Sequence, residues 1–312
     1  MKRLFPVICL CSCLVAAHSF AGSMTFTQGT DAPDDIESFT VGSGPWGLAF
    51  DGANIWVTSY SSPYLVTELR ASDGMLLGTF EAGGSTLNAA FDGTYIWVTN
   101  SLNNTVSRLR ASDGTLEGSF AVADHPAGIL FDGSSIWVGS NGADTVTKLR
   151  PDDGTILGTF SVPSPLGFAF DGSDIWIASY ITNTVTKLRA SDGTLEGRFR
   201  VGLTPNGVVF DGADIWTGNA GNNTVTKLQA SDGAFLGKRR VGRSPRHLAF
   251  DGVHIWVSNA DDDTVMRLKR GRGIIDHTYQ VEIEPAVILF DGTSIWVANY
   301  GSNTVSKITP NH

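Results

Sequence analysis

The sequence repeats one short motif seven times. Each copy joins Phe-Asp-Gly to Ile-Trp across two residues, and successive copies lie 39 to 41 residues apart, beginning at Phe50, Phe91, Phe131, Phe170, Phe210, Phe250 and Phe290. A period near 40 residues, with several short β-rich runs per copy, is typical of a β-propeller and not of a helical solenoid. The spacing therefore predicts a ring of seven similar units.

The copy from Pro205 to Gly242 shows how one unit is expected to fold. Its apolar and β-branched runs alternate with Asp-Gly turns, which predicts four short antiparallel strands joined by three tight turns. The last copy ends after its third strand, at Thr304 to Ile308. We therefore expect an all-β, seven-bladed propeller in which Glu37 to Val41 supplies the missing outer strand of the last blade and closes the ring.

Two residue types recur at fixed places in every copy. We interpret the aspartates as turn formers, not as a ring of metal ligands, because a turn explains each of them separately. We interpret the tryptophans as core packing between blades, not as a stacking platform, because one ligand has little use for seven equivalent rings. The tryptophans are Trp56, Trp97, Trp137, Trp176, Trp216, Trp256 and Trp296.

The N-terminus has the three-part form of a secretory signal peptide. Lys2 and Arg3 precede an apolar run of about 14 residues and a small-residue end at Ala21. That run is shorter than the roughly 20 residues of a membrane-spanning helix. We expect a signal peptide over 1–21, a flexible lead-in over 22–35, a propeller over 36–310, no membrane span, and a secreted or periplasmic monomer.

The cysteines and the charge exclude several functions. Cys9, Cys11 and Cys13 all lie in the leader, so the rest of the chain has no disulfide or thiolate chemistry; lipidation at Cys13 is a less favoured alternative to cleavage. The chain without its leader holds 20 basic and 31 acidic residues, a charge of −11, which disfavours general nucleic-acid binding.

One segment departs from this acidic composition. Residues 238–272 hold nine basic and four acidic side chains, and Arg239 stands where the other six copies have Phe or Tyr. A solvated edge that discourages strand pairing is one interpretation. Docking of an anionic polymer or partner is the other.

The repeat Pro-x-Gly-Leu-Ala-Phe-Asp-Gly-x-x-Ile-Trp-Val-x-Asn, continued by Asn-Thr-Val-x-Lys-Leu, resembles that of NHL, YVTN and streptogramin-lyase-like propellers over residues 36–310. These families include binding scaffolds, lactonases and lyases on one frame. The resemblance to the lyases implies a catalytic His directly after the Pro of a blade and a Glu fourteen residues later, acting with Mg²⁺.

No blade of this chain has that pair. The position after Pro reads Trp46, Leu87, Ala127, Leu166, Asn206, Arg246 and Ala286, and the position fourteen residues on reads Tyr60, Ser101, Asn141, Tyr180, Ala220, Ala260 and Tyr300. His247 and Asp261 each lie one residue late, so a shifted pair would require both side chains to change face. We therefore assign no catalytic residue.

The two ends of the blades differ. The Asp-Gly and Ser-Asp-Gly turns at one end are nearly invariant, whereas the loops after the second and fourth strands vary, and function tends to lie on such loops. We therefore place a ligand site on the variable face, at Trp46, Tyr60, Asn100, Tyr180, Asn206, Asn219, Arg246, Asn259, Asn299 and Tyr300. Asn100, Asn219, Asn259 and Asn299 have an alternative role, which is to close their own turns.

Aromatic and amide groups suit sugars or peptides. We expect a non-catalytic exported scaffold that binds a protein, peptide or glycan. The alternative is a metal-dependent lactonase or lyase acting on a cyclic ester at the channel mouth. We assign no cofactor and no metal residue; Mg²⁺, or Ca²⁺ at Asp261 to Asp263, is a lesser possibility. A quinone-cofactor dehydrogenase is suggested only by the Ser-Asp-Gly turns, and the tryptophans lie in the wrong strand for it.

Overall fold

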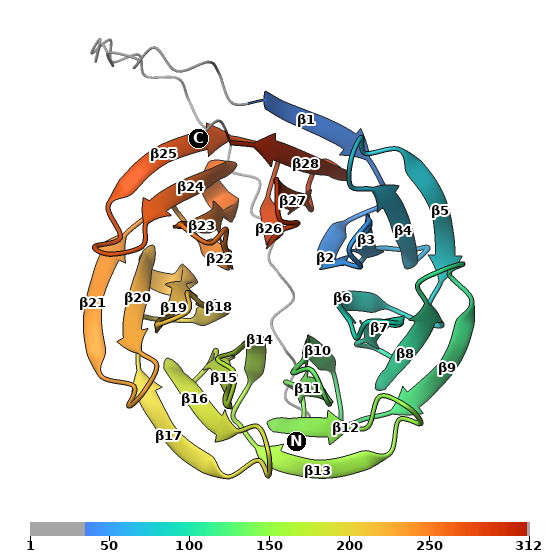
Figure 1. Cartoon of the computed structure of the whole chain (residues 1–312), viewed down its shortest axis with the longest axis horizontal. Coiled ribbons are helices and arrows are strands. Elements are labelled where there is room, and N and C mark those ends of the chain that lie inside the picture. The colour runs from blue at the N-terminus through green and yellow to red at the C-terminus, as the bar shows by residue number, and fades with distance from the viewer. Residues whose placement is uncertain (1–34, 311–312) are drawn as a thin grey trace, which may run out of the picture. The chain divides into compact units, whose positions relative to one another are not determined.

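The computed structural model describes residues 35–310, which form a ring of seven four-stranded antiparallel sheets (Figure 1). The expected seven-bladed fold is confirmed. The expected signal peptide, and the lead-in up to residue 34, lie outside the described residues. We number the blades 1 to 7 by their inner strands, which are β2 (Pro45–Phe50), β6 (Thr86–Phe91), β10 (Pro126–Phe131), β14 (Pro165–Phe170), β18 (Pro205–Phe210), β22 (Pro245–Phe250) and β26 (Pro285–Phe290).

Each inner strand runs from the variable face to the Asp-Gly turn, and the chain then moves outward through the blade. The second strands are β3 (Asn54–Ser59), β7 (Tyr95–Asn100), β11 (Ile136–Ser140), β15 (Asp174–Ser179), β19 (Asp214–Asn219), β23 (His254–Asn259) and β27 (Ile295–Asn299). The third strands are β4 (Leu65–Arg70), β8 (Thr105–Arg110), β12 (Thr145–Leu149), β16 (Thr184–Arg189), β20 (Thr224–Gln229), β24 (Thr264–Lys269) and β28 (Thr304–Thr309). The outer strands are β5 (Leu76–Glu81), β9 (Leu116–Ala121), β13 (Ile156–Ser161), β17 (Leu195–Arg200), β21 (Phe235–Arg240), β25 (Ile275–Gln280) and β1 (Asp35–Thr40). Short 3₁₀ turns follow β19 and β23 at η1 (Ala220–Asn222) and η2 (Ala260–Asp262).

The N-terminal strand β1 completes blade 7. It pairs antiparallel with β28 in the sheet order β1-β28-β27-β26, and Phe39 lies opposite Val305. The ring of Phe39 packs on Trp296 with their centroids 5.7 Å apart. The predicted closure by one N-terminal strand and three C-terminal strands is therefore confirmed.

The repeated tryptophans form the core between blades. Trp56 is fully buried, as are five of its counterparts, while Trp216 is 2% exposed. Trp56 packs against Phe80 of the outer strand, with ring centroids 5.4 Å apart, and the same aromatic pairing recurs in five further blades. Burial of large rings is the main source of stability in a fold without disulfides.

The repeated aspartates join the turn to this core. In blade 1, Asp51 Oδ1 accepts hydrogen bonds from the backbone N–H groups of Ala53 and Asn54, and Oδ2 accepts one from Trp56 Nε1 at 2.8 Å. The indole bond recurs in the other six blades at 2.7 to 2.8 Å. Each carboxylate thus satisfies a buried indole N–H as well as closing its turn.

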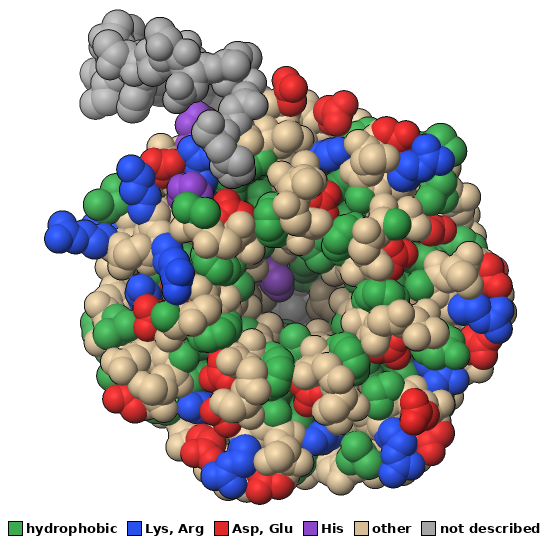
Figure 2. All heavy atoms as spheres, in the orientation of Figure 1, with side chains coloured by type: hydrophobic (Ala, Val, Ile, Leu, Met, Phe, Trp, Pro, Cys, Tyr) green, Lys and Arg blue, Asp and Glu red, His purple; other side chains and the backbone are tan. Residues whose placement is uncertain are grey.

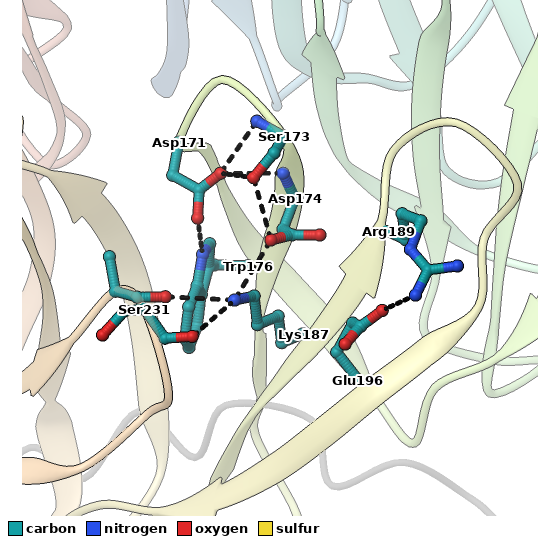
Figure 3. Close-up of polar contacts among 9 residues, drawn as sticks. Asp171, Ser173, Asp174, Trp176, Lys187, Arg189, Glu196 and Ser231 are labelled. Atoms are coloured by element: carbon teal, nitrogen blue, oxygen red, sulfur yellow. Dashed lines mark hydrogen bonds and ion pairs between the residues drawn. The ribbon is translucent and has the colours of Figure 1, made fainter.

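A lysine of the third strand links neighbouring blades. Lys187 Nζ donates to the carbonyl oxygens of Ala230 and Ser231 in the next blade, at 3.0 and 3.4 Å, and pairs with Asp174 at 3.0 Å (Figure 3). The same ammonium lies 5.0 Å from the centroid of Trp176. At the ring closure, Lys307 Nζ donates in the same way to the carbonyl oxygens of Ala71 and Ser72 in blade 1, both at 2.9 Å.

Blade 5 lacks the aromatic cover. Arg239 lies opposite Val225, in the register that Phe199 and its counterparts occupy opposite their own valines. No ring from β21 therefore covers Trp216. The Lys227 ammonium lies 5.0 Å from its centroid, the turn glycine Gly273 lies beside it, and apolar side chains such as Val225 and Leu248 keep it buried.

Replacing Arg239 with Phe is expected to stabilise the ring by about 1 kcal/mol, because a ring at this position stacks on Trp216. Urea unfolding of Arg239→Phe and of the wild-type chain measures the difference. Arg240→Phe, on the same strand but opposite Thr224, is the matched control and is expected to change stability by less than about 0.5 kcal/mol. A gain shared by both variants contradicts the explanation.

Figure 2 shows one face of the ring, where most charged side chains gather toward the outer rim around a central opening. Across residues 35–310 no helix has the length and apolar character needed to span a membrane.

Candidate functional site

The variable face is built from the loops after the second and outer strands. In blade 1, Tyr60 follows β3 and its backbone N–H donates to the carbonyl of Gly44, which precedes β2, at 2.8 Å. In blade 7, the N–H of Tyr300 donates in the same way to Glu284, at 3.0 Å. These backbone bonds hold the residues after the second strands next to the first residues of the inner strands, including Trp46.

Three of the predicted site residues form one aromatic cluster. The Trp46 centroid lies 5.9 Å from that of Tyr60 and 5.6 Å from that of Tyr300, and the two tyrosine centroids are 6.3 Å apart. Tyr60 is 38% exposed, while Trp46 and Tyr300 are half-buried. The cluster spans the junction where blade 7 meets blade 1. We call it the aromatic cluster below.

Gly44 makes this arrangement possible. A Cβ atom on Gly44 would lie 3.0 Å from Cε2 of Tyr300 and 2.7 Å from the Ser61 hydroxyl, and the φ of this residue is +61°. The other residues that precede an inner-strand proline adopt the same left-handed conformation with a side chain, as His125 and Thr204 do. Glycine at 44 therefore leaves space for the Tyr300 ring.

Arg246 reaches the cluster from blade 6. Its guanidinium carbon lies 5.3 Å from the Trp46 centroid, and Nη2 lies 4.0 Å from a carboxylate oxygen of Glu284. Its Nη1 is buried without a hydrogen-bond partner among the described residues. The arginine side chain is 19% exposed. The site thus combines apolar rings with a guanidinium that retains donor capacity.

Four of the five predicted asparagines lie elsewhere. Asn219 is fully buried; its Oδ1 accepts from Gly202 N at 2.9 Å, and its Nδ2 donates to the Thr224 and Thr226 hydroxyls. Asn100, Asn259 and Asn299 are also fully buried, and each donates to the hydroxyl of the threonine five residues later. These amides close their own loops, so we leave them out of the candidate site.

The other two predicted residues lie away from the aromatic cluster. Tyr180 follows β15 in blade 4 and is 39% exposed, and Asn206 is half-buried on β18 in blade 5 (Figure 1). The structure therefore brings together Trp46, Tyr60, Arg246 and Tyr300 from the predicted set. It adds Glu284, which is signalled in the sequence only by its place before a blade proline.

The acidic run in blade 6 has structural roles. Both carboxylate oxygens of Asp262 accept from Arg243, and Asp263 Oδ1 accepts from the N–H of Glu284 at 2.9 Å. Asp263 also holds a left-handed conformation, with φ 55°. Among the described residues, no group of three or more His, Cys, Asp or Glu side chains is placed to hold a metal ion.

His247 lies next to Arg246, at a strand position that is glycine in four other blades. Burial lowers the pKa of its imidazole to about 4, against opposing interactions with the backbone of Ile288 and Leu248. Its Nδ1 has no hydrogen-bond partner among the described residues. No hydrogen bond or ion pair within residues 35–310 joins it to Asp261, the shifted partner considered from the sequence.

The low pKa of the His247 imidazole predicts a pH dependence of stability. Because its pKa is lower in the folded chain than in the unfolded chain, the unfolded chain binds the extra proton first as pH falls from about 6.5 to 4. The contribution of the neutral imidazole to the free energy of unfolding is therefore fully present above about pH 6.5 and is lost progressively as the pH falls from 6.5 to 4. Between pH 7 and pH 5, the free energy of unfolding of the wild-type chain is expected to fall by about 2 kcal/mol more than that of His247→Asn.

Denaturant unfolding at both pH values measures this difference. Asparagine is the matched replacement, because Asn88 fills the same position in blade 2 and donates to the Ala127 carbonyl at 3.0 Å. Equal pH dependence in the two chains contradicts a lowered pKa for the His247 imidazole.

Comparisons with known proteins agree with the fold. No protein-family model matches the chain, and no curated protein matches it. A solved structure of streptogramin B lyase superposes with a TM-score of 0.76 and 20% sequence identity, over 89% of this chain and 98% of that one. The chain is thus a seven-bladed β-propeller with the fold seen in a streptogramin B lyase, and a shared fold does not fix the role of the variable face.

Proposed function

We propose that this chain is a non-catalytic binding propeller whose aromatic cluster holds a glycan or a peptide segment on the variable face. The observation that carries the proposal is the meeting of Trp46, Tyr60 and Tyr300 at one blade junction, with a partly exposed surface and Arg246 beside them. Aromatic faces stack on sugar rings and on peptide side chains, and they carry a large share of binding energy at interfaces.

The cluster also occupies informative positions. Trp46 and Arg246 follow the prolines of their blades, and Tyr60 and Tyr300 stand fourteen residues after such positions. The resemblance to streptogramin-lyase-like propellers places a catalytic His and Glu there. This chain carries rings and a guanidinium instead, which supports binding without general acid-base chemistry.

Substitution of the exposed ring tests the proposal. A glycan and peptide array probed with the chain from residue 22 onward supplies a ligand, and Tyr60→Ala is expected to weaken its binding roughly tenfold. Tyr180→Ala is the matched control, because the two tyrosines are 38% and 39% exposed at equivalent places in blades 1 and 4. Equal weakening by both variants, or no ligand on the arrays, contradicts the proposal.

Fluorescence gives a second readout. Trp46 is the one tryptophan outside the seven buried framework positions, so a ligand-dependent emission change is expected to disappear in Trp46→Phe.

A metal-dependent lactonase or lyase is the second candidate, favoured by the fold shared with streptogramin B lyase. Calorimetric titration with Mg²⁺, Ca²⁺ and Mn²⁺ separates the two proposals. Micromolar binding that is abolished by Glu284→Gln favours the enzyme. Ligand binding that is unchanged by chelator favours the scaffold.

A further inference from the structure

Five basic side chains line the outer strands of two neighbouring blades, and a sixth lies in the adjoining turn of the next blade. Arg198 and Arg200 lie on β17, Lys238, Arg239 and Arg240 lie on β21, and Arg272 lies in the turn of blade 6 that faces β21; all six are exposed. Figure 1 shows β17 and β21 side by side on the rim. We call these six residues the outer basic patch.

The ring itself does not require this charge. Arg198 and Lys238 occupy the fourth position of their outer strands, and Arg200 and Arg240 occupy the sixth. The other five outer strands hold no Lys or Arg at these positions, which read Thr79 and Glu81, Ser119 and Ala121, Thr159 and Ser161, Thr278 and Gln280, and Ser38 and Thr40. Protection of an exposed edge applies equally to all seven blades, so it does not explain a charge confined to two.

Among the described residues, no acidic side chain pairs with the patch; Glu196 of β17 pairs with Arg189 instead. In the turns between the third and outer strands of blades 1 to 4, Arg70, Arg110, Arg150 and Arg189 each pair with the aspartate three residues later. None of the six patch residues makes an ion pair within residues 35–310. Arg198 Nη2 donates to the Ser161 carbonyl and Arg239 Nη2 to the Arg272 carbonyl, both at 3.1 Å, which leaves most of their donors available.

Arg239 adds a third observation. It replaces the ring that covers the blade tryptophan in the other six blades, and nothing in the packing of Trp216 accounts for the change. Arg239 thus replaces a core contact with a charge that has no acidic partner, beside Lys238 and Arg240, and this exchange favours a role in binding.

We propose that the outer basic patch binds an acidic polysaccharide, through guanidinium contacts to the carboxylate or sulfate groups of successive sugars. Side chains two apart on a strand project on the same side, roughly 7 Å from each other, so Lys238 and Arg240 present a spaced pair of cations, as do Arg198 and Arg200. Arginine binds such planar or tetrahedral anions in bidentate fashion.

Nucleic acid fits the patch less well. Phe199, between the two arginines of β17, packs on Trp176, and Phe235 lies at the far end of β21, so no ring alternates with the cations to stack on bases.

Calorimetry tests the proposal with defined probes in 50 mM salt. The chain from residue 22 onward is titrated with a heparin-derived hexasaccharide, a galacturonate hexamer, a 12-nucleotide single strand and a 12-base-pair duplex. The first two separate sulfate from carboxylate as the recognised group. Binding of at least one acidic sugar more tightly than both nucleic acids is expected; the reverse order, or no binding to either sugar, overturns the proposal.

Charge-matched variants locate the surface. In one variant, Arg198 and Lys238 are changed to Thr and Arg200 and Arg240 to Ser, the residues at these positions in blade 3. This variant is expected to bind acidic sugar roughly 50-fold more weakly and with a flatter salt dependence. Changing Arg70, Arg110, Arg150 and Arg189 to Gln removes the same charge from the turns of blades 1 to 4, outside the patch, and is expected to weaken binding less than about 3-fold. Equal losses of affinity in the two variants overturn the assignment. A single Arg240→Ser change, which is expected to lower the affinity for the acidic sugar about 3-fold, checks the result in a minimally altered chain.

This inference is independent of the aromatic cluster. Tyr60→Ala is expected to leave acidic-sugar binding to the outer basic patch unchanged, so failure of either proposal is visible without the other.

Discussion

A chain that begins at Val41 is expected to be less stable than one that begins at Asp34 by about 5 kcal/mol or more. The deletion removes β1, opens the edge of β28 and uncovers Trp296, which Phe39 packs against at 5.7 Å. Losing the phenylalanine ring alone is worth about 3 to 5 kcal/mol at a well-packed site. Thermal and denaturant unfolding of the two chains measures the loss.

A peptide of residues 34–43 added in trans provides the control for this deletion. It restores the strand without restoring the covalent link, so it is expected to raise the melting temperature of the chain that begins at Val41 in a concentration-dependent way. A peptide in which Phe39 is replaced by Ala is expected to raise the melting temperature less. Equal stability of the two chains contradicts a closing role for β1.

Replacing Gly128 with Ala is expected to cost about 3 kcal/mol or more. A Cβ on this residue would lie 1.8 Å from the carbonyl oxygen of Leu166 in the next blade, so two backbones must separate. Gly271→Ala is the control, since nothing lies within 4 Å of its added Cβ and its backbone conformation suits any residue; its effect is expected to stay within about 0.5 kcal/mol.

Gly167 and Gly207 occupy the same strand position as Gly128 in blades 4 and 5, and their substitution is expected to destabilise the ring to different extents. The nearest backbone atom to an added Cβ is the Asn206 carbonyl oxygen at 2.2 Å for Gly167, and Cα of His247 at 2.7 Å for Gly207. Urea midpoints are therefore expected to fall most for Gly128→Ala, less for Gly167→Ala and least for Gly207→Ala. A different order contradicts close inner-strand approach as the cause.

The architecture could be predicted because it is written in local periodicity. The spacing of Phe-Asp-Gly gives the number of blades, and the missing outer strand of the last copy gives the closure by β1. The double role of Asp51 was missed, since the sequence shows the Asp-Gly turn but not that a carboxylate oxygen five residues before Trp56 meets its indole N–H. The contacts of Lys187 were missed for a similar reason, because their acceptors lie 43 and 44 residues away in the next blade.

The candidate site was predicted only in part. Trp46 and Arg246 stood out because they break the pattern of their neighbours, and Tyr60 and Tyr300 followed from their loop positions. Asn219 and its counterparts have the same loop positions, and only the direction of the side chain separates them from a surface role. That direction depends on the threonine hydroxyls that neighbour each amide across the hairpin. Glu284 was missed, as it comes near Arg246 only through the junction of blades 6 and 7.

The closing contacts carry a consequence for biosynthesis. Lys307 Nζ donates to the carbonyls of Ala71 and Ser72 at 2.9 Å, and β28 pairs with β1, so nearly the whole chain separates the partners. Within the described residues, β1 is the first strand to leave the ribosome and β28 the last, so β1 waits for β28 and no partial product can complete the ring. Such distant pairing slows folding, and a chain halted before Thr304 exposes unpaired strands that invite aggregation.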